Sequence, residues 1–430
     1  MANTLGVSAV SDSRSGDFQP PRVAVVQDGA RNHYATPIAL HRAGILEGMF
    51  TDLFVKSGSG SDIVLSFVKQ FGIAKRANER RCKELDRANV VQSFWLTLRS
   101  RMRRLRHEPL DVYYQRVAEL TESWIMNRGF GSANALMGFV LNMSHGLCEA
   151  ARRQGMVTVA DQMIAPASVL RREVAIQADR WPHWEQTVPS DCFDRLHRTE
   201  HLTWSALDQI TCASEYVRQG LIGEGIAGEK VTLIHYPVME KLLDFVDRQG
   251  RSGPVVVGFI GTVGLRKGAP YLFEVARRFN PKEVRFVMVG PVYLQKWVVS
   301  KFAGNVEVIG GVPRSEVAAW LRKFDIMLFP STCEGSACAL MEAMASGLPV
   351  VTSPNSGSVA RHGQEGFIAP YDDIDALAGY VRQLVENPDR RLEMGRAARE
   401  YCGQFNLDYY SLELAAMFHR LVGGLTTEKL

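Results

Sequence analysis

The stretch 326–353 reads IMLFPSTCEGSACALMEAMASGLPVVTS, and its pattern decides the fold. The apolar run Ile326–Pro330 has the length and composition of a buried strand. Small residues follow it, then an apolar helical pattern over Cys338–Ser346 that Gly347 ends, and a second strand-like run over Pro349–Ser353. Strand, loop, helix and strand in this order predict a βαβ unit of a parallel sheet.

The same alternation extends toward the N-terminus through the second half of the chain. Further strands are predicted at Val255–Thr262, Val284–Gly290 and Val306–Gly310. Helical patterns are predicted at Ala269–Phe279, Val292–Phe302 and Ser315–Phe324. Repeated βαβ units of this length place helices on both faces of a parallel sheet.

The first half repeats the theme less regularly. Strands are predicted at Arg22–Gln27, Thr51–Val55, Met156–Ala160, Gln209–Ser214 and Val231–His235. Helices are predicted at Tyr34–Ala43, Asn142–Gln154 and Glu215–Gly223. The stretch 57–128 has helical periodicity and many basic residues, and we interpret it as a helical excursion from the first sheet.

The length of 430 residues suits two domains better than one core. A polar, Gly-rich connection at 246–254 is typical of a domain boundary. We therefore expect an α/β protein with two Rossmann-like, doubly wound domains that face each other across a cleft. The expected parts are a disordered tail (1–21), a first domain (22–250), a second domain (254–405) and a C-terminal helix (406–430).

The basic charge of the chain comes from one segment. The formal net charge is +4, which is too small to indicate a nucleic-acid partner. Between Lys69 and Arg106, however, twelve basic residues stand against three acidic ones. The end of this segment, 95–106, is open to two interpretations: a solvated helix face, or a patch that binds an anionic membrane surface.

Cysteine usage and hydropathy bear on the compartment. The seven cysteines are scattered and lack the spacing of a metal or redox motif, as expected for a reducing cytoplasm. The first twenty residues lack the apolar run of a secretory signal, and no stretch approaches eighteen consecutive apolar residues. We expect a cytoplasmic protein, peripheral on the inner face of the membrane if the basic segment binds lipid.

The chemistry is expected at the loop after Ile326–Pro330, because ligands of doubly wound sheets gather beyond the carboxyl ends of the strands. Glu334 and Gly335 form this loop, and small residues open the following helix. Small residues let a phosphate group approach the free N–H groups of a first helical turn. Glu342 lies further along the helix, so that two carboxylates suit the hydroxyls of a sugar and of a second polyol. A diphosphate-linked sugar fits this pattern.

This segment resembles the signature of retaining nucleotide-sugar glycosyltransferases of family 4, the "glycosyl transferases group 1", which have a GT-B fold and two glutamates separated by seven residues. The resemblance covers most of the chain from Arg22 onward, except 57–128. Further segments that carry it are Gly258–Gly268, Val289–Pro291, Asp325–Ser331, Glu365–Ile368, Leu207–Glu215 and Lys230–Pro237.

The resemblance implies a hexosyltransferase of polysaccharide, glycolipid or other glycoconjugate synthesis. It implies a nucleotide sugar such as a UDP- or GDP-sugar as donor, a sugar or lipid-linked acceptor, and neither a metal nor another cofactor. Glu334 is then expected at the donor sugar hydroxyls, Glu342 at the ribose, and Lys267 at the diphosphate. Gly335, Ser336 and Ala337 complete the expected donor loop. The last helix, near Leu407–Val422, is expected to cross back to the first domain.

The sequence departs from the family pattern at three places. Thr262 stands where relatives often have arginine, and Arg266 is the candidate substitute. Asp161 stands where many relatives have a histidine near the reacting carbon, and we predict it as a polar group at the reaction centre, although turns and caps also favour aspartate. In the stretch 27–31, which corresponds to the glycine-rich loop at the donor phosphates, only Gly29 is typical.

Two other functions remain compatible with these residues. A related GT-B enzyme, either a phosphorylase or a sugar-nucleotide epimerase, uses a similar fold with phosphate or a single substrate. A non-catalytic sugar-nucleotide-binding protein is the alternative from a different class, and the departures at Thr262 and Asp161 are compatible with it.

Overall fold

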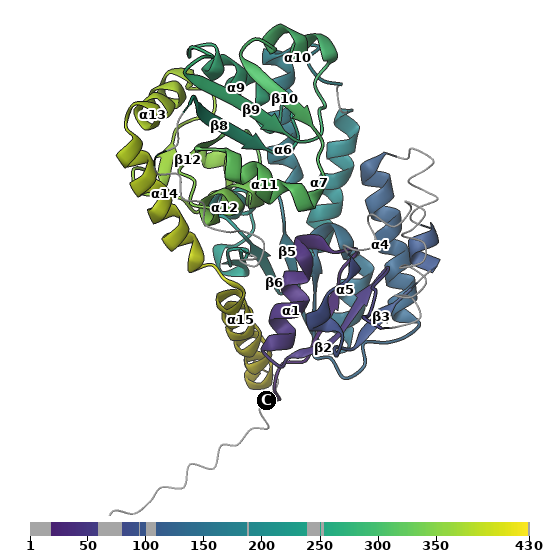
Figure 1. The fold of residues 1–430 in the computed structure, drawn as a ribbon. Helices are drawn as coiled ribbons and strands as arrows, with labels where there is room; N and C mark the ends of the chain where they lie inside the picture. Colours follow the sequence, from purple (N-terminus) through teal and green to yellow (C-terminus); the bar gives the residue numbers. More distant parts are fainter. Residues whose placement is uncertain are drawn as a thin grey trace, which may run out of the picture.

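Two parallel sheets organise the chain (Figure 1). The computed structural model describes residues 19–58, 80–93, 95–99, 109–186, 189–238, 250 and 253–428. The first sheet has seven strands in the order β3-β2-β1-β4-β5-β6-β7, and the second has six in the order β10-β9-β8-β11-β12-β13. The strand order reverses beside the first strand of each sheet, as in doubly wound folds. The expected α/β class with two such sheets is confirmed.

The first sheet comprises β1 (Val23–Val26), β2 (Leu46–Thr51), β3 (Val90–Gln92), β4 (Ala135–Phe139), β5 (Val157–Gln162), β6 (Gln209–Cys212) and β7 (Val231–Leu233). Its helices are α1 (Ala35–Arg42), α4 (Leu110–Met126), α5 (His145–Arg153), α6 (Ala167–Arg180), α7 (Ser190–Ser205) and α8 (Glu215–Gly223). Two apolar clusters cover the two faces of this sheet. Such burial on both faces is typical of parallel sheets.

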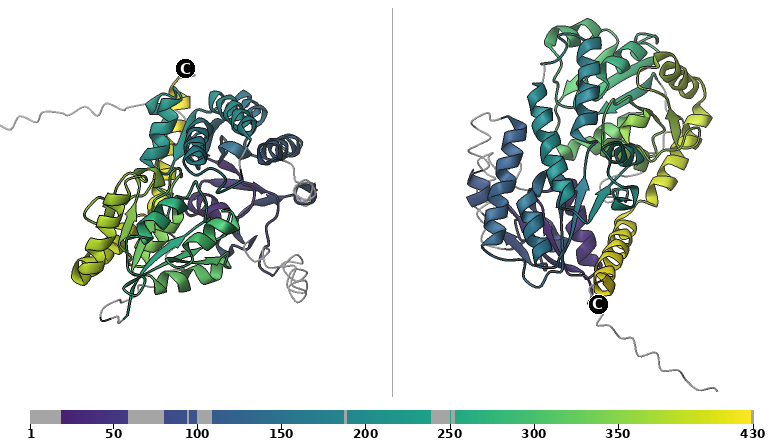
Figure 2. Two further views of the ribbon diagram at one scale, coloured as in Figure 1. Left: turned by 90° about the horizontal axis from the view of Figure 1, so that it is seen from above. Right: turned by 180° about the vertical axis from the view of Figure 1, so that it is seen from behind.

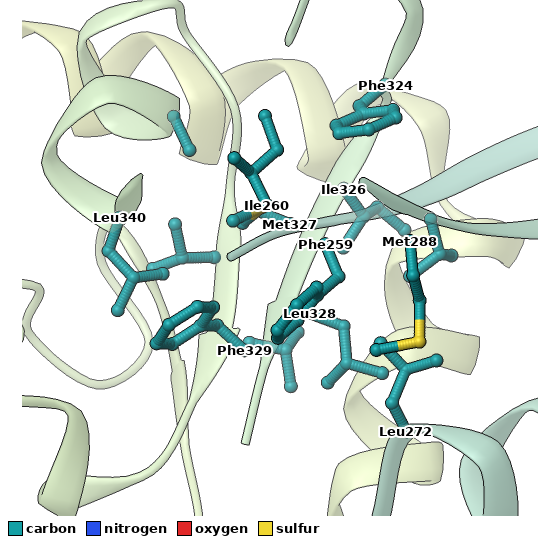
Figure 3. Close-up of a cluster of buried hydrophobic side chains, with 14 of the residues drawn as sticks. Phe259, Ile260, Leu272, Met288, Phe324, Ile326, Met327, Leu328, Phe329 and Leu340 are labelled. Carbon is teal, nitrogen blue, oxygen red and sulfur yellow. The ribbon is translucent and has the colours of Figure 1, made fainter. Parts of the chain in front are cut away.

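The second sheet comprises β8 (Val255–Ile260), β9 (Val284–Val289), β10 (Val306–Gly310), β11 (Ile326–Phe329), β12 (Val350–Thr352) and β13 (Gly366–Ile368). Its helices are α9 (Ala269–Ala276), α10 (Lys296–Phe302), α11 (Val317–Lys323), α12 (Cys338–Ala345), α13 (Ile374–Glu386) and α14 (Pro388–Gly403), after which α15 (Leu407–Glu428) follows. Every residue of β11 is buried. Figure 3 shows Phe259 and Phe329 in this core, where their rings stack at 5.2 Å.

Several predictions for the first half were wrong. The predicted strand Thr51–Val55 lies earlier, at Leu46–Thr51, and the predicted excursion contributes the edge strand β3. The central strand β4 was not predicted, because its residues ALMGF include no β-branched side chain and suit a helix equally well. Helices α6 and α7 were also not predicted. Strand β5 continues through Gln162, so Asp161 belongs to the strand.

Helices α6 and α7 form a hairpin that reaches from the first sheet to the second (Figure 2, right). Beyond the end of α6, Trp184 belongs to the apolar core of the second sheet. Along α6, Gln177 accepts a hydrogen bond from the Tyr271 hydroxyl at 2.5 Å, and Arg180 pairs with Asp372 at 2.8 Å. The hairpin therefore packs against both halves of the molecule.

The last helix, α15, packs on α1 of the first half (Figure 1). The Tyr410 hydroxyl lies 3.1 Å from Thr36 Oγ1, and Ser411 donates a hydrogen bond to the Ala39 carbonyl at 2.7 Å. Leu414 and Phe418 are fully buried in the cluster on this face of the first sheet.

Some expectations fall outside the described residues. These are the tail up to residue 18, most of the connection at 246–254, and most of the basic segment, including Arg101, Arg103, Arg104 and Arg106. Among the helices in the described ranges, none combines the length and apolarity that a membrane crossing requires.

Candidate active site

The Glu334 carboxylate lies at the carboxyl ends of β8 and β11, where two cations meet it. Arg266 Nη1 lies 2.8 Å and Lys267 Nζ 2.5 Å from the same oxygen, Glu334 Oε1. Only 9% of the Glu334 side chain and 17% of the Lys267 side chain are exposed. The structure thus brings together Arg266, Lys267 and Glu334, three of the residues that the sequence predicts at the donor site. Two cations around one carboxylate leave positive charge for a further anionic group.

Burial changes the pKa of the Lys267 ammonium group. Desolvation lowers the pKa of Lys267; the Glu334 carboxylate opposes this effect, and Arg266 reinforces it. The Nζ atom lies 5.3 Å from the centre of the ring of Phe329, which belongs to the core shown in Figure 3. A compact cation at the rim of an apolar core binds phosphate oxygens with little competition from water.

Hydrogen bonds, and one position that only glycine can occupy, fix the backbone around these cations. The Arg266 carbonyl accepts hydrogen bonds from Thr332 N at 3.0 Å and from Ser331 Oγ at 3.1 Å. Gly268 has a φ of 76°, and a Cβ atom there would lie 1.8 Å from the Pro330 carbonyl oxygen. The loop after β8 is thereby held against the loop after β11, which fixes the distance between Lys267 and Glu334.

The start of α12 offers backbone donors beside Glu334. Ala337 N donates to the Ser356 carbonyl at 3.1 Å, whereas no acceptor is found among the described residues for the N–H groups of Cys338 and Ala339. Ser336 is half-buried and Ala337 is buried, so that no large side chain precedes the helix. The arrangement suits a phosphate group.

Loops of the first half lie directly on the Glu334 loop. Ser214, at the start of α8, donates a hydrogen bond to the Gly335 carbonyl, and Ala165 N donates to the Glu334 carbonyl at 3.4 Å. A Cβ atom on Gly335 would lie 1.6 Å from the Met163 carbonyl oxygen. Glycine at 335 is therefore required for this close approach, which brings the carboxyl edges of the two sheets together.

Glu342 lies apart from this cluster and has a partner that the sequence did not indicate. Arg314, which follows β10, binds both carboxylate oxygens of Glu342, one of them at 2.9 Å. The Glu342 side chain is 14% exposed. The only signal for Arg314 in the sequence was its place just after a predicted strand, which puts it at the carboxyl edge of the sheet.

The remaining predicted residues of the second half and of β5 occupy different surroundings. Thr262 follows β8 and is half-buried. Asp161 is buried, and its two oxygens accept hydrogen bonds from Thr211 Oγ1 at 2.9 Å and from the Tyr236 hydroxyl. Burial raises the pKa of Asp161 to about 6, although both hydrogen bonds act in the opposite direction. Asp161 thus lies within β5, which continues beyond the predicted end of the strand at Ala160.

Gly29 follows β1, next to a pocket at the carboxyl ends of β1 and β2 that both polar and apolar side chains line. Its φ is 77°, and its N–H donates to Asp52 Oδ1 at 3.0 Å. Arg80 Nη1 lies 2.6 Å from the same oxygen. The pocket is lined in part by Gln27, Asp28, Asp52, Trp124 and Asn142. Burial, followed by the charge of Asp52, raises the pKa of Asp28 to about 6. The sequence did not indicate this acidic pair.

Comparison with known proteins finds similarity to glycosyltransferases. The family model described as "Glycosyl transferases group 1" matches residues 254–387. The amylovoran biosynthesis glycosyltransferase AmsK of Erwinia amylovora is 27% identical over 47% of this chain and 53% of its own length. Glycogen synthase of Mycobacterium tuberculosis is 25% identical over 63% of this chain and 72% of its own length.

Solved structures share the fold across nearly the whole chain. Sucrose-phosphate synthase of Thermosynechococcus elongatus has a TM-score of 0.62 at 16% identity and covers 94% of this chain and 100% of its own. Anabaena HepE, solved with UDP and glucose, has a TM-score of 0.58 at 14% identity and covers 92% of this chain and 99% of its own.

The fold, the donor loop and these similarities define a nucleotide-sugar glycosyltransferase of the GT-B class. Within that class, residues 254–387 match the family of the glycosyl transferases group 1.

Proposed function

We propose that the protein transfers a hexose from a nucleotide diphospho-sugar to a hydroxyl group of a sugar or lipid-linked acceptor, with retention at the anomeric carbon. One observation carries the proposal: Arg266, Lys267 and Glu334 converge at the mouth of α12, opposite loops of the first sheet. The AmsK relative is named for amylovoran biosynthesis, so we place the activity in polysaccharide or glycoconjugate synthesis.

In this proposal the donor replaces the contacts that the cations now make with Glu334. Lys267 and Arg266 hold the diphosphate, together with the N–H groups of Cys338 and Ala339. Glu334 is then free to accept hydrogen bonds from the donor sugar hydroxyls. The cations act most strongly when the sugar–phosphate bond breaks, because the leaving diphosphate gains negative charge at that moment. The chain supplies these positive groups itself, and the proposal includes no metal.

Glu342 is proposed to accept the ribose hydroxyls while Arg314 fixes its carboxylate. Because Arg314 already binds both oxygens, the ribose uses the lone pairs that remain. HepE was solved with UDP, so a UDP-sugar is the first donor to test, and a GDP-sugar is the second.

The acceptor is proposed to bind at the pocket around Gln27, Asp28 and Asn142, which opens at the carboxyl edge of the first sheet. Aspartate and amide groups there match the hydroxyls of a saccharide. Gly29, in the loop after β1, is proposed to let this loop approach the donor phosphates. Contact between the Gly335 loop and Met163 excludes water from the region between the sheets.

Asp161 is proposed to act on the reaction centre through Tyr236. The Tyr236 hydroxyl donates a hydrogen bond to Asp161, and burial raises the pKa of Tyr236 well above its ordinary value. By accepting this bond, the buried Asp161 carboxylate fixes the ring of Tyr236, which follows β7 in the chain. Asp161 is therefore a positioning residue in this scheme.

The test is a transfer assay with UDP- and GDP-sugars and a panel of mono- and oligosaccharide acceptors, with the product anomer assigned by NMR. We expect transfer with retention, and loss of transfer in Glu334→Gln while circular dichroism stays native. Sugar release that requires inorganic phosphate would identify a phosphorylase instead. Donor binding without turnover on any acceptor would identify a non-catalytic binder.

A second proposal concerns the basic segment 95–106 and an anionic membrane surface. In its described part, Trp95 is 69% exposed and Leu98 is 37% exposed, as expected for side chains that enter a lipid interface. We expect the wild-type protein to sediment with vesicles that contain phosphatidylglycerol. Reversal of Arg101, Arg103, Arg104 and Arg106 to glutamate should abolish sedimentation, and persistent binding would reject this role.

A further inference from the structure

Two histidines and a glutamate converge at the base of the α6–α7 hairpin, on residues that the donor and acceptor sites do not use. His197 and His201 lie one helical turn apart on α7, and Glu224 follows α8. His197 Nε2 lies 2.8 Å and His201 Nε2 lies 2.9 Å from Glu224 Oε2, and the two nitrogens are 3.1 Å apart. The three atoms form a nearly equilateral triangle.

Hydrogen bonds alone account poorly for this triangle. Each imidazole nitrogen carries at most one hydrogen, so two N–H groups that donate to Glu224 Oε2 leave the 3.1 Å approach of the two nitrogens without a hydrogen bond. Three donor atoms that share a common centre are instead the geometry of cation ligands. Bonds of about 2.0–2.1 Å to a tetrahedral Zn²⁺ give ligand–ligand distances of about 3.3 Å, so a shift of a few tenths of an ångström would accommodate the ion.

The surroundings of the triangle suit a bound ion. Ser168 of α6 donates a hydrogen bond to the second oxygen of Glu224, which orients the carboxylate in the way that outer-shell groups orient metal ligands. The His201 ring packs against the Trp204 ring at 4.9 Å. The side chains of His197 and His201 are 37% and 42% exposed, so an ion can enter and keep a water molecule as its fourth ligand.

We propose that His197, His201 and Glu224 bind one Zn²⁺ ion. The ion links α7 to the end of α8 and, through Ser168, to the start of α6. Two imidazoles with one carboxylate are a ligand set that favours Zn²⁺ over Mg²⁺ or Ca²⁺, which prefer oxygen ligands. Because the other end of the hairpin packs in the core of the second sheet through Trp184, the ion stiffens an element that joins the two halves of the molecule.

The experiment uses the untagged full-length protein after chelator treatment and dialysis, titrated with ZnCl₂ in a calorimeter. We expect one equivalent to bind. His201→Gln and Glu224→Gln should each weaken binding at least ten-fold, and Ser168→Ala by about ten-fold, the lower end of outer-shell effects. His41→Gln, on α1 and outside the cluster, is the matched control and should bind like the wild type.

A second readout separates loss of ligand from loss of fold. Far-UV circular dichroism of each variant should match the wild type, and Co²⁺ should give the visible absorption of a four-coordinate site in the wild type and the control only. Absence of stoichiometric Zn²⁺ binding, or equal affinity in His201→Gln and the wild type, would overturn the proposal and leave a hydrogen-bonded cluster. Selective binding of Mg²⁺ or Ca²⁺ would overturn it as well.

Discussion

Lys267 carries the positive charge closest to Glu334. Its burial strengthens the attraction between that charge and a bound phosphate group. Lys267→Ala should reduce sugar transfer about 100- to 1,000-fold, the range seen when one preorganised group that stabilises developing charge is removed. The exposed Lys296→Ala on α10 is the control and should keep full activity. Initial rates under saturating donor, with native circular dichroism, check the expectation. Equal rates in both variants would remove Lys267 from the site.

Asp161 should make stability depend on pH in a defined direction. Its pKa is about 6 in the folded protein against an ordinary value of 3.8, so the unfolded chain loses this proton first as pH rises. The wild type should therefore lose stability relative to Asp161→Asn between about pH 4 and pH 6, by up to about 3 kcal/mol. Urea unfolding of both proteins across this range measures the difference. A constant difference would show that Asp161 is ionised at an ordinary pKa.

The residues of the donor site were predictable where the motif is local in the sequence. Glu334 and Lys267 each follow a strand, and strands β8 and β11 are neighbours, so their loops had to meet. Arg314 and the pair of Asp28 and Asp52 were not predicted. Their partners lie on other loops, and only the packing of the whole edge brings them together.

At the scale of elements, Gly335 joins the donor loop to the loop after β5. Gly335→Ala should clash with the Met163 carbonyl and destabilise the protein by about 1–3 kcal/mol, with loss of transfer. Gly304→Ala is the matched control, because a Cβ atom there meets nothing within 4 Å. Chemical denaturation measures the free energy of unfolding of the two variants. Equal stability would mean that the two loops separate freely.

The elements themselves were predictable where the pattern is regular. The unit β11-α12-β12 follows from an apolar run, small residues and a terminating glycine. Strand β4 was missed, because long-range pairing with β1 and β5 outweighs the helical preference of its alanine, leucine and methionine. The α6–α7 hairpin was missed because polar residues, among them Glu173, Gln177 and Glu200, occupy its buried positions.

At the scale of the molecule, α15 connects the end of the second half to α1 of the first. Leu414→Ala removes a fully buried side chain and should lower the free energy of unfolding by about 2–5 kcal/mol. Leu412→Ala, two residues away and 71% exposed, should change it little. Urea unfolding of both variants tests whether α15 stabilises the first half. Similar values for the two would argue that it does not.

We propose that Lys267, with Glu334 and the start of α12, forms the site for the diphosphate of a nucleotide sugar. Its most direct test is the calorimetric affinity of UDP and GDP for the wild type, Lys267→Ala and the control Lys296→Ala. We expect one of the two nucleotides to bind the wild type and the control equally, and Lys267→Ala at least ten-fold more weakly, since a charge-assisted hydrogen bond contributes about 1.5–3 kcal/mol. Binding of neither nucleotide, or equal binding by all three proteins, would contradict the claim.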